Sequence, residues 1–256
     1  MRHILRSFYL SLFGTFKKPN PGVHILNSHY VTPDFSEESD WLIFEGFVKY
    51  LSKHCKLITI QEATQLIAKR QFQQKECLVA LTFDDGFEEC YTTIAPLLEK
   101  YNCYATFFIN TNYIESNEKY QQQFHNRIKT WTKKPMTWKQ VKELHKRGHV
   151  IGSHTLDHAN LFELAESEIE YQILENKRIL EEKLNYNCIY FAWTFGQLQH
   201  FPEEALNCAL KYHKYIFSGT NYKQYFSMND TVINRRHIEA FWPKSHINYF
   251  LSVHKK

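Results

Sequence analysis

Two adjacent carboxylates follow the apolar run Cys77–Phe83 in this chain of 256 residues. They belong to Asp84 and Asp85, and Gly86 after them allows the backbone to turn sharply. Two acids at the end of a strand repel each other and lose hydration, so the pattern predicts a cation beside them. Because neighbouring side chains point in different directions, one carboxylate can bind an ion while the other stays free to act as a base. The alternative is that the pair caps the N-terminus of a helix.

Two histidines later in the chain are candidate partners for the carboxylate pair. His154 and His158 directly follow the predicted strand 149–153 and are four positions apart. This spacing places both imidazoles on one face if the segment turns helically. Two imidazoles and one carboxylate are a common ligand set for a catalytic metal ion. Taken together, the two segments therefore predict a metal site.

The segments that would position these residues alternate between strands and helices after the turn-rich stretch 19–22. Thr137, with Gln140 three residues later, predicts a capped helix that ends at Gly148. The polar segment 111–135 lacks periodicity and is predicted to be a long loop. We expect strands at 23–27, 57–60, 77–83, 104–109, 149–153, 188–193, 215–218 and 231–234, and further helices at 40–54, 61–70, 88–101, 167–184 and 203–212.

This alternation predicts a parallel α/β fold with one catalytic domain over residues 21–256. The continuous apolar run 77–83 indicates a strand that is covered on both faces. A closed barrel and an open doubly wound sheet both fit the pattern. Both arrangements place chemistry at the carboxyl ends of the strands.

The net charge is concentrated at one end of the chain. There are 31 basic and 27 acidic residues, and residues 1–20 contain four of the basic ones and no acid, so the remainder is neutral. A neutral body argues against a nucleic-acid-binding domain. Six scattered cysteines without a Cys-x-x-Cys pair favour buried reduced thiols, and with them a cytoplasmic location.

Residues 1–20 form a basic amphipathic segment. No stretch of the sequence reaches the roughly 18 apolar residues that a membrane-spanning helix requires. One interpretation is a helix that lies on the surface of a membrane, as a peripheral contact at the inner membrane. The other is a terminal helix packed on its own domain. The apolar positions of the stripe are Leu5, Phe8, Tyr9, Leu12, Phe13 and Phe16.

At this point the chain resembles a known family, the polysaccharide deacetylases of carbohydrate esterase family 4. The segment 82–86, Thr-Phe-Asp-Asp-Gly, is similar to the first motif of that family, and 154–158 is similar to its second motif, His-Ser/Thr-x-x-His. The lead-in 138–153, the strand 105–109 and the segment 189–196 also look like the family. The resemblance spans roughly residues 23–240.

The resemblance implies a distorted (β/α) barrel of about seven strands and one divalent metal ion. Asp84 matches the catalytic base, and Asp85, His154 and His158 match the metal ligands. Zinc is the first expectation for the ion, with cobalt, nickel and manganese as alternatives. The implied reaction is removal of the acetyl group from an amino sugar.

The chain departs from the family's third motif, Arg-x-Pro-Tyr/Phe, because the matching stretch 191–196 lacks both the arginine and the proline. This stretch is closer to the variant found in bacterial surface-glycan deacetylases. We expect Arg235, in preference to Arg236, to supply the missing cation beside Asp84. The alternative is that both arginines lie on the surface.

The family's late Leu-x-His motif is not recognisable either. His237 is the expected general acid by position, ahead of His254. His29 follows the first predicted strand and is either a substrate-binding or a structural residue. The other expected substrate-binding residues are Trp193, Phe195 and Gly196.

The leading interpretation is a metal-dependent hydrolase that removes an acetyl group, or alternatively a formyl group, from a bacterial surface glycan or glycolipid precursor. Two other classes stay open. The chain could be a non-catalytic glycan-binding protein that retains the metal site, or an amidohydrolase that acts on a non-sugar amide. Release of acetate from amino sugars distinguishes the first class from the other two.

Overall fold

The computed structural model describes residues 2–34, 37–219 and 221–256. Within these ranges one sheet runs in the order β10-β1-β3-β4-β5-β6-β7-β9-β8, and β2 pairs with β3 beside this path. All of the pairings are parallel except the one between β8 and β9. The strands are β1 (Gly22–Ser28), β2 (Lys56–Leu57), β3 (Cys77–Phe83), β4 (Thr106–Ile109), β5 (Val150–Ser153), β6 (Tyr190–Ala192), β7 (Tyr215–Ser218), β8 (Phe226–Ser227), β9 (Val232–Asn234) and β10 (Arg236–His237).

The predicted barrel of about seven strands is confirmed, with additional short strands. Of the ten strands in the described ranges, seven have three or more residues, and β2, β8 and β10 have two each. The sheet curls so that Arg235 alone separates β9 from β10, which pairs with β1 near the other end of the strand order. The backbone at Arg235 therefore links the two ends of the curled sheet.

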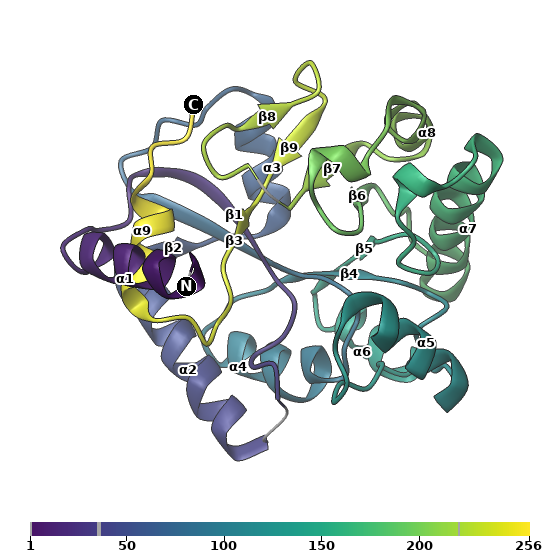
Figure 1. Cartoon of the computed structure of the whole chain (residues 1–256), viewed down its shortest axis with the longest axis horizontal. Helices are drawn as coiled ribbons and strands as arrows, with labels where there is room; N and C mark the ends of the chain where they lie inside the picture. The colour runs from purple at the N-terminus through teal and green to yellow at the C-terminus, as the bar shows by residue number, and fades with distance from the viewer. Residues whose placement is uncertain (1, 35–36, 220) are drawn as a thin grey trace.

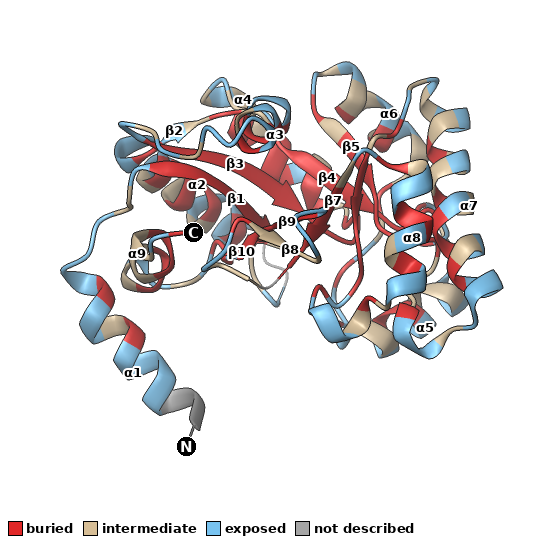
Figure 2. Cartoon of the chain, turned by 90° about the horizontal axis from the view of Figure 1, so that it is seen from above, coloured by how far each residue is buried: buried red, intermediate tan, exposed pale blue. Residues whose placement is uncertain are grey.

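Helices surround this sheet (Figure 1), and the strands at the centre are buried (Figure 2). On β3, the residues at 77, 79, 81 and 83 pack into one apolar cluster, while Leu78 and Ala80 pack into another. The prediction of a strand covered on both faces is thus confirmed. The helices are α1 (Arg2–Thr15), α2 (Glu37–His54), α3 (Ile60–Ala68), α4 (Ala95–Lys100), α5 (Glu118–Ile128), α6 (Trp138–Lys146), α7 (Glu166–Leu184), α8 (Glu203–Tyr212) and α9 (Lys244–Ser252).

One sequence prediction about helices is wrong, and another is confirmed in a divided form. The segment 111–135, predicted to be a loop, contains α5, which the side chain of Asn117 caps by accepting from the Tyr120 amide. Only Phe124 and His125 of this helix are buried, so its apolar periodicity is too weak to detect in the sequence. The helix predicted at 88–101 is divided into a π-helical turn, Cys90–Ile94, followed by α4. Pro96 in the first turn of α4 has no amide hydrogen to donate, which favours this break in the regular ladder.

The terminal helix α1 lies beside α9 at the edge of the molecule (Figures 1 and 2). Leu10 is buried in this contact, and the amide of Asn20 donates to the Leu251 carbonyl to hold the connecting segment. No helix in the described part of the chain is both long and apolar enough to cross a bilayer.

Candidate active site

The predicted site residues lie at the carboxyl-end side of the sheet, and all of them except the fully buried Arg235 border one cleft of about 620 Å³. His29 follows β1, Asp84 and Asp85 follow β3, and His154 follows β5. The other predicted residues that line the cleft are His158, Trp193, Phe195, Gly196 and His237. In this parallel sheet the carboxyl ends lie on one side, which brings the residues together.

Asp84 is held by Arg235 in a buried bidentate ion pair. Nη1 of Arg235 donates to Oδ1 and Nη2 donates to Oδ2 of Asp84, each at 2.7 Å. Arg235 is fixed in turn because Nε donates to the Ser218 carbonyl at 3.0 Å and Nη1 donates to Thr82 Oγ1 at 2.9 Å. Burial is the largest single effect and raises the pKa of the Asp84 carboxyl, but the charge and hydrogen bonds of Arg235, with smaller effects of His154 and His29, together outweigh it and the pKa is lowered. Asp84 is therefore ionised and oriented at neutral pH.

The neighbouring Arg236 has a different environment. Its guanidinium donates to the carbonyls of Phe250 and Val253 at the end of α9, and the side chain is fully buried. The alternative that both arginines lie on the surface is wrong. Successive residues of an extended segment face opposite sides, so Arg235 faces Asp84 and Arg236 faces the end of α9.

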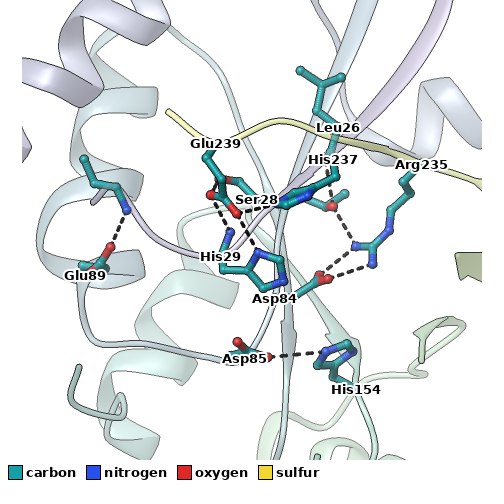
Figure 3. Close-up of polar contacts among 12 residues, drawn as sticks. Leu26, Ser28, His29, Asp84, Asp85, Glu89, His154, Arg235, His237 and Glu239 are labelled. Atoms are coloured by element: carbon teal, nitrogen blue, oxygen red, sulfur yellow. Dashed lines mark hydrogen bonds and ion pairs between the residues drawn. The ribbon is translucent and has the colours of Figure 1, made fainter. Parts of the chain in front are cut away.

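Asp85, His154 and His158 form a second buried cluster. Figure 3 shows Asp85 and His154 of this cluster beside Asp84. Nε2 of His154 lies 3.5 Å from Oδ1 of Asp85, and Nε2 of His158 lies 3.3 Å from the same oxygen. Although burial raises the pKa of Asp85, the two histidine rings lower it below its usual range. Burial lowers the pKa of His158, which favours the neutral imidazole.

The backbone around this cluster is sharply turned. Asp85 has φ 78° and Gly86 has φ 86°, and a Cβ on Gly86 would lie 3.1 Å from side-chain carbons of Ile109 and Ile114. Glycine is therefore required at position 86, as the sequence predicted.

The segment 154–158 does not take the helical turn that would have placed both imidazoles on one helix face. Thr155 has φ 64° and His158 has φ 54°, so the two imidazoles converge from a loop. The side-chain amide of Asn110 donates to the carbonyls of both His154 and Thr155. Within a helical turn these two carbonyls would accept hydrogen bonds from backbone amides. In the loop they accept hydrogen bonds from the Asn110 side chain instead.

The cluster fits a divalent metal ion. Oδ1 of Asp85 is buried and accepts no hydrogen bond within the described structure. Nδ1 of His154 donates to the Ala192 carbonyl at 2.7 Å, which leaves the lone pair of Nε2 directed to Asp85. One carboxylate oxygen and one nitrogen from each imidazole, all within 4.8 Å of one another, match the donor set of a divalent metal site.

A third group of polar side chains lies on the same cleft and is centred on Glu239. Oε1 of Glu239 lies 2.7 Å from Nδ1 of His29 and 2.7 Å from Nε2 of His237, and Oε2 accepts from Ser28 Oγ at 2.6 Å. Burial is the largest single effect and lowers the pKa of His29, but the hydrogen bond to Glu239 and the charges of Glu239, Asp85 and Asp84 together outweigh it and raise the pKa to about 9. His29 is therefore a cation at neutral pH.

Phe195, Gly196 and Trp193 border the cleft in different ways. The Phe195 ring is exposed and contacts the His158 ring edge-on at 4.9 Å between centroids. A Cβ on Gly196 would lie 2.9 Å from the Cα of Gly219, so position 196 serves close backbone packing. The Trp193 indole is 0% exposed and stacks on Phe201, which leaves no ring face for a ligand.

A sequence model of the family described as Polysaccharide deacetylase matches residues 72–213, more than half of the chain. The chain belongs to the polysaccharide deacetylase family. The match includes Asp84, Asp85, His154 and His158, whereas Arg235, His237 and His29 lie outside the matched residues.

Individual members of the polysaccharide deacetylase family show the extent of the similarity. The peptidoglycan-N-acetylglucosamine deacetylase of Bacillus cereus is 32% identical over 121 residues, which are 47% of this chain and 37% of that protein. The poly-beta-1,6-N-acetyl-D-glucosamine N-deacetylase of Staphylococcus aureus strain MRSA252 is 26% identical over 60% of this chain and 52% of its own length. The chain thus spans about half or less of the length of these relatives.

The fold is shared with solved structures of the family. The Streptococcus pyogenes deacetylase PplD in complex with acetate superposes with a TM-score of 0.71 and 21% identity, covering 91% of this chain and 99% of that one. At this level of identity the similarity shows the fold alone.

Glu239 belongs to this deacetylase-family site but was not predicted from the sequence. A signal was present, because Arg235, His237 and Glu239 alternate after a predicted strand, and alternate residues of an extended segment share a face. The same rule places Arg236 on the other face, where the structure finds it. The six cysteines predicted to be reduced are free thiols in the structure.

Proposed function

We propose that the chain is a metal-dependent hydrolase that removes the N-acetyl group from an amino sugar. The observation that carries this proposal is the pairing of an oriented carboxylate, Asp84, with the unpartnered donor set of Asp85, His154 and His158 in one cleft. A metal ion at that donor set would polarise an amide carbonyl and lower the pKa of a water molecule. Zinc is the proposed ion, and cobalt, nickel and manganese accept the same ligands.

The residues of the chain suit the proton transfers of amide hydrolysis. Asp84 is ionised and would accept a proton from the attacking water, while Arg235 holds both of its oxygens in place. The water oxygen bonds to the acetyl carbon, the carbon–nitrogen bond breaks, and acetate and a free amine are the products. The departing nitrogen requires a proton, which a cationic group on the cleft must deliver.

His29 is the better-supported proton donor, in place of the expected His237. Glu239 holds the His29 ring at 2.7 Å and keeps it protonated with a pKa of about 9. In Figure 3 the His29 ring lies toward Asp84 and Asp85 from the opposite side to Arg235. His237 contacts the same Glu239 oxygen from the more exposed side, so we assign it a supporting role in positioning Glu239.

The proposed substrate is a bacterial surface glycan or its glycolipid precursor. Two relatives have names that specify N-acetylglucosamine polymers, which supports an amino sugar here. The cleft adds support because a second cavity, of about 650 Å³, shares Arg127 and Phe195 with it. Two adjoining cavities of this size suit a saccharide of several units better than a single sugar. We also propose a cytoplasmic location, which the six free cysteines support.

The test is release of acetate from a panel of N-acetylated and N-formylated mono- and oligosaccharides, with zinc or cobalt supplied. We expect acetate and a free amino sugar in equal amounts from the wild-type protein and none from Asp84→Asn. Tight binding of a saccharide without any release would identify a glycan-binding protein instead. Formate as the only product would identify a deformylase.

A further inference from the structure

The terminal helix α1 has two faces, and the structure decides which one packs on the domain. The inner face carries small residues and Leu10, which is 6% exposed. Nε2 of His246 on α9 lies 3.2 Å from the carbonyl oxygen of Ser7 and 3.1 Å from Oγ of Ser11. The helix is therefore attached to α9 through its least apolar side.

Gly14 fixes the rotation of α1 about its axis. A Cβ at this position would lie 1.8 Å from the backbone oxygen of Ser245. At such a close approach of two helix backbones, only glycine fits, and no larger residue of α1 can replace it at the contact. The helix cannot turn its apolar side onto α9 without losing this contact.

The outer face of α1 is consequently presented to solvent, although it is strongly apolar. Phe8 is 68% exposed, Leu12 is 50% exposed and Phe16 is 87% exposed. Figure 2 shows α1 projecting from the body of the molecule, so a flat surface can reach this face. The outer face consists of Leu5, Phe8, Leu12, Phe13 and Phe16, all of them exposed. Tyr9, also exposed, lies at the border of this face, because its ring contacts Tyr249 of α9 edge-on at 5.8 Å between ring centroids.

The charges around the outer face have one sign. Arg6, Lys17 and Lys18 are exposed on or next to the helix, and residues 1–20 contain no acid. A second copy of this chain would bring an equally basic helix against the first, and the two would repel each other. An anionic surface with an apolar interior complements both the cations and the rings.

We propose that the outer face of α1 binds the surface of an anionic lipid bilayer. The phenylalanine and leucine side chains enter the interface between headgroups and acyl chains, and the basic residues contact the headgroups. α9 acts as the rigid support that keeps the outer face directed at the lipid. This proposal is independent of the catalytic chemistry, because none of these residues borders the cleft.

The test is co-sedimentation of the full-length protein with vesicles of phosphatidylcholine alone or mixed with phosphatidylglycerol. We expect binding to the mixed vesicles that weakens as salt is added, and little binding to the neutral ones. Replacing Phe8 and Phe16 together by serine should lower the partition coefficient about tenfold or more. The double variant Arg6→Gln/Lys18→Gln should lower it about tenfold at low salt.

Matched controls lie far from α1. Tyr171→Ser removes a similarly exposed ring from α7, and Lys139→Gln/Lys142→Gln removes two exposed charges from α6. Both should bind vesicles like the wild type, and all variants should keep the wild-type circular dichroism. Unchanged vesicle binding by Phe8→Ser/Phe16→Ser would overturn the proposal. A wild-type dimer that this variant converts to a monomer would also overturn it, by identifying a second copy as the occupant.

Discussion

The guanidinium of Arg235 holds both carboxylate oxygens of Asp84 at 2.7 Å, although the two residues are 151 positions apart in the chain. Asp84 follows the buried strand β3, and Arg235 is the residue that links β9 to β10. The ion pair thus connects the proposed base to the point where the curled sheet meets itself. Orientation of the base depends on the closure of the fold.

The two neighbouring carboxylates should respond differently to the same substitution. Asp84→Asn should retain the metal ion and lose turnover by about 10²–10⁴-fold, because general-base catalysis contributes that much. Asp85→Asn should lose the metal ion together with activity. Metal content measured by mass spectrometry after dialysis distinguishes the two, and equal metal loss in both variants would contradict the division of roles.

Removal of the Arg235 charge should change the pH dependence of kcat/KM. Burial raises the pKa of Asp84 and Arg235 lowers it, so in Arg235→Met the effect of burial dominates. A base is active when it is deprotonated, so the acidic limb of the profile should move to higher pH. The control is Arg236→Met, which removes a buried arginine that contacts α9. It should lower stability and leave the position of that limb unchanged.

Glu239 should set the alkaline limb of the same profile. The pKa of His29 is raised to about 9, so His29 stays protonated, and its ion pair with Glu239 stays intact, up to that pH. The proton and the ion pair are lost as the pH rises through the raised pKa. Glu239→Gln removes the main cause of the rise, and the alkaline limb should move down by about 1–3 pH units. His29→Asn should abolish the limb, whereas a limb unaffected by either change would exclude His29 as the proton donor.

The buried ion pair between Lys133 and Glu89 should matter for stability. The two side chains are 1% and 3% exposed and lie 2.5 Å apart, and Glu89 also accepts from the amide of Val31. Lys133→Met leaves a buried carboxylate without its cation and should lower the free energy of unfolding by roughly 3–5 kcal/mol. The double variant Lys133→Met/Glu89→Gln should recover part of that loss. Chemical denaturation measures both, and a double variant less stable than Lys133→Met would contradict the account.

The local sequence was sufficient to locate the strand ends that carry the site. The apolar run 77–83 followed by Asp84, Asp85 and Gly86 defines a buried strand and a sharp turn. Local patterns also predicted the capped helix α6, where Thr137 and Gln140 form the expected reciprocal hydrogen bonds. These features depend on neighbours a few residues apart, and a sequence displays such neighbours directly.

Only the tertiary structure decided which distant groups meet. The sequence could rank Arg235 above Arg236, but the course of the chain between β9 and β10 decides that Arg235 meets Asp84 and Arg236 meets the end of α9. Glu239 joins His29 to His237 because β10 pairs with β1. The outer face of α1 stays exposed because Gly14 packs against Ser245 on α9. Each of these outcomes depends on contacts between segments far apart in the chain. Side-chain volume and the path of the chain decide which residues meet in such contacts, and the local sequence pattern does not contain that information.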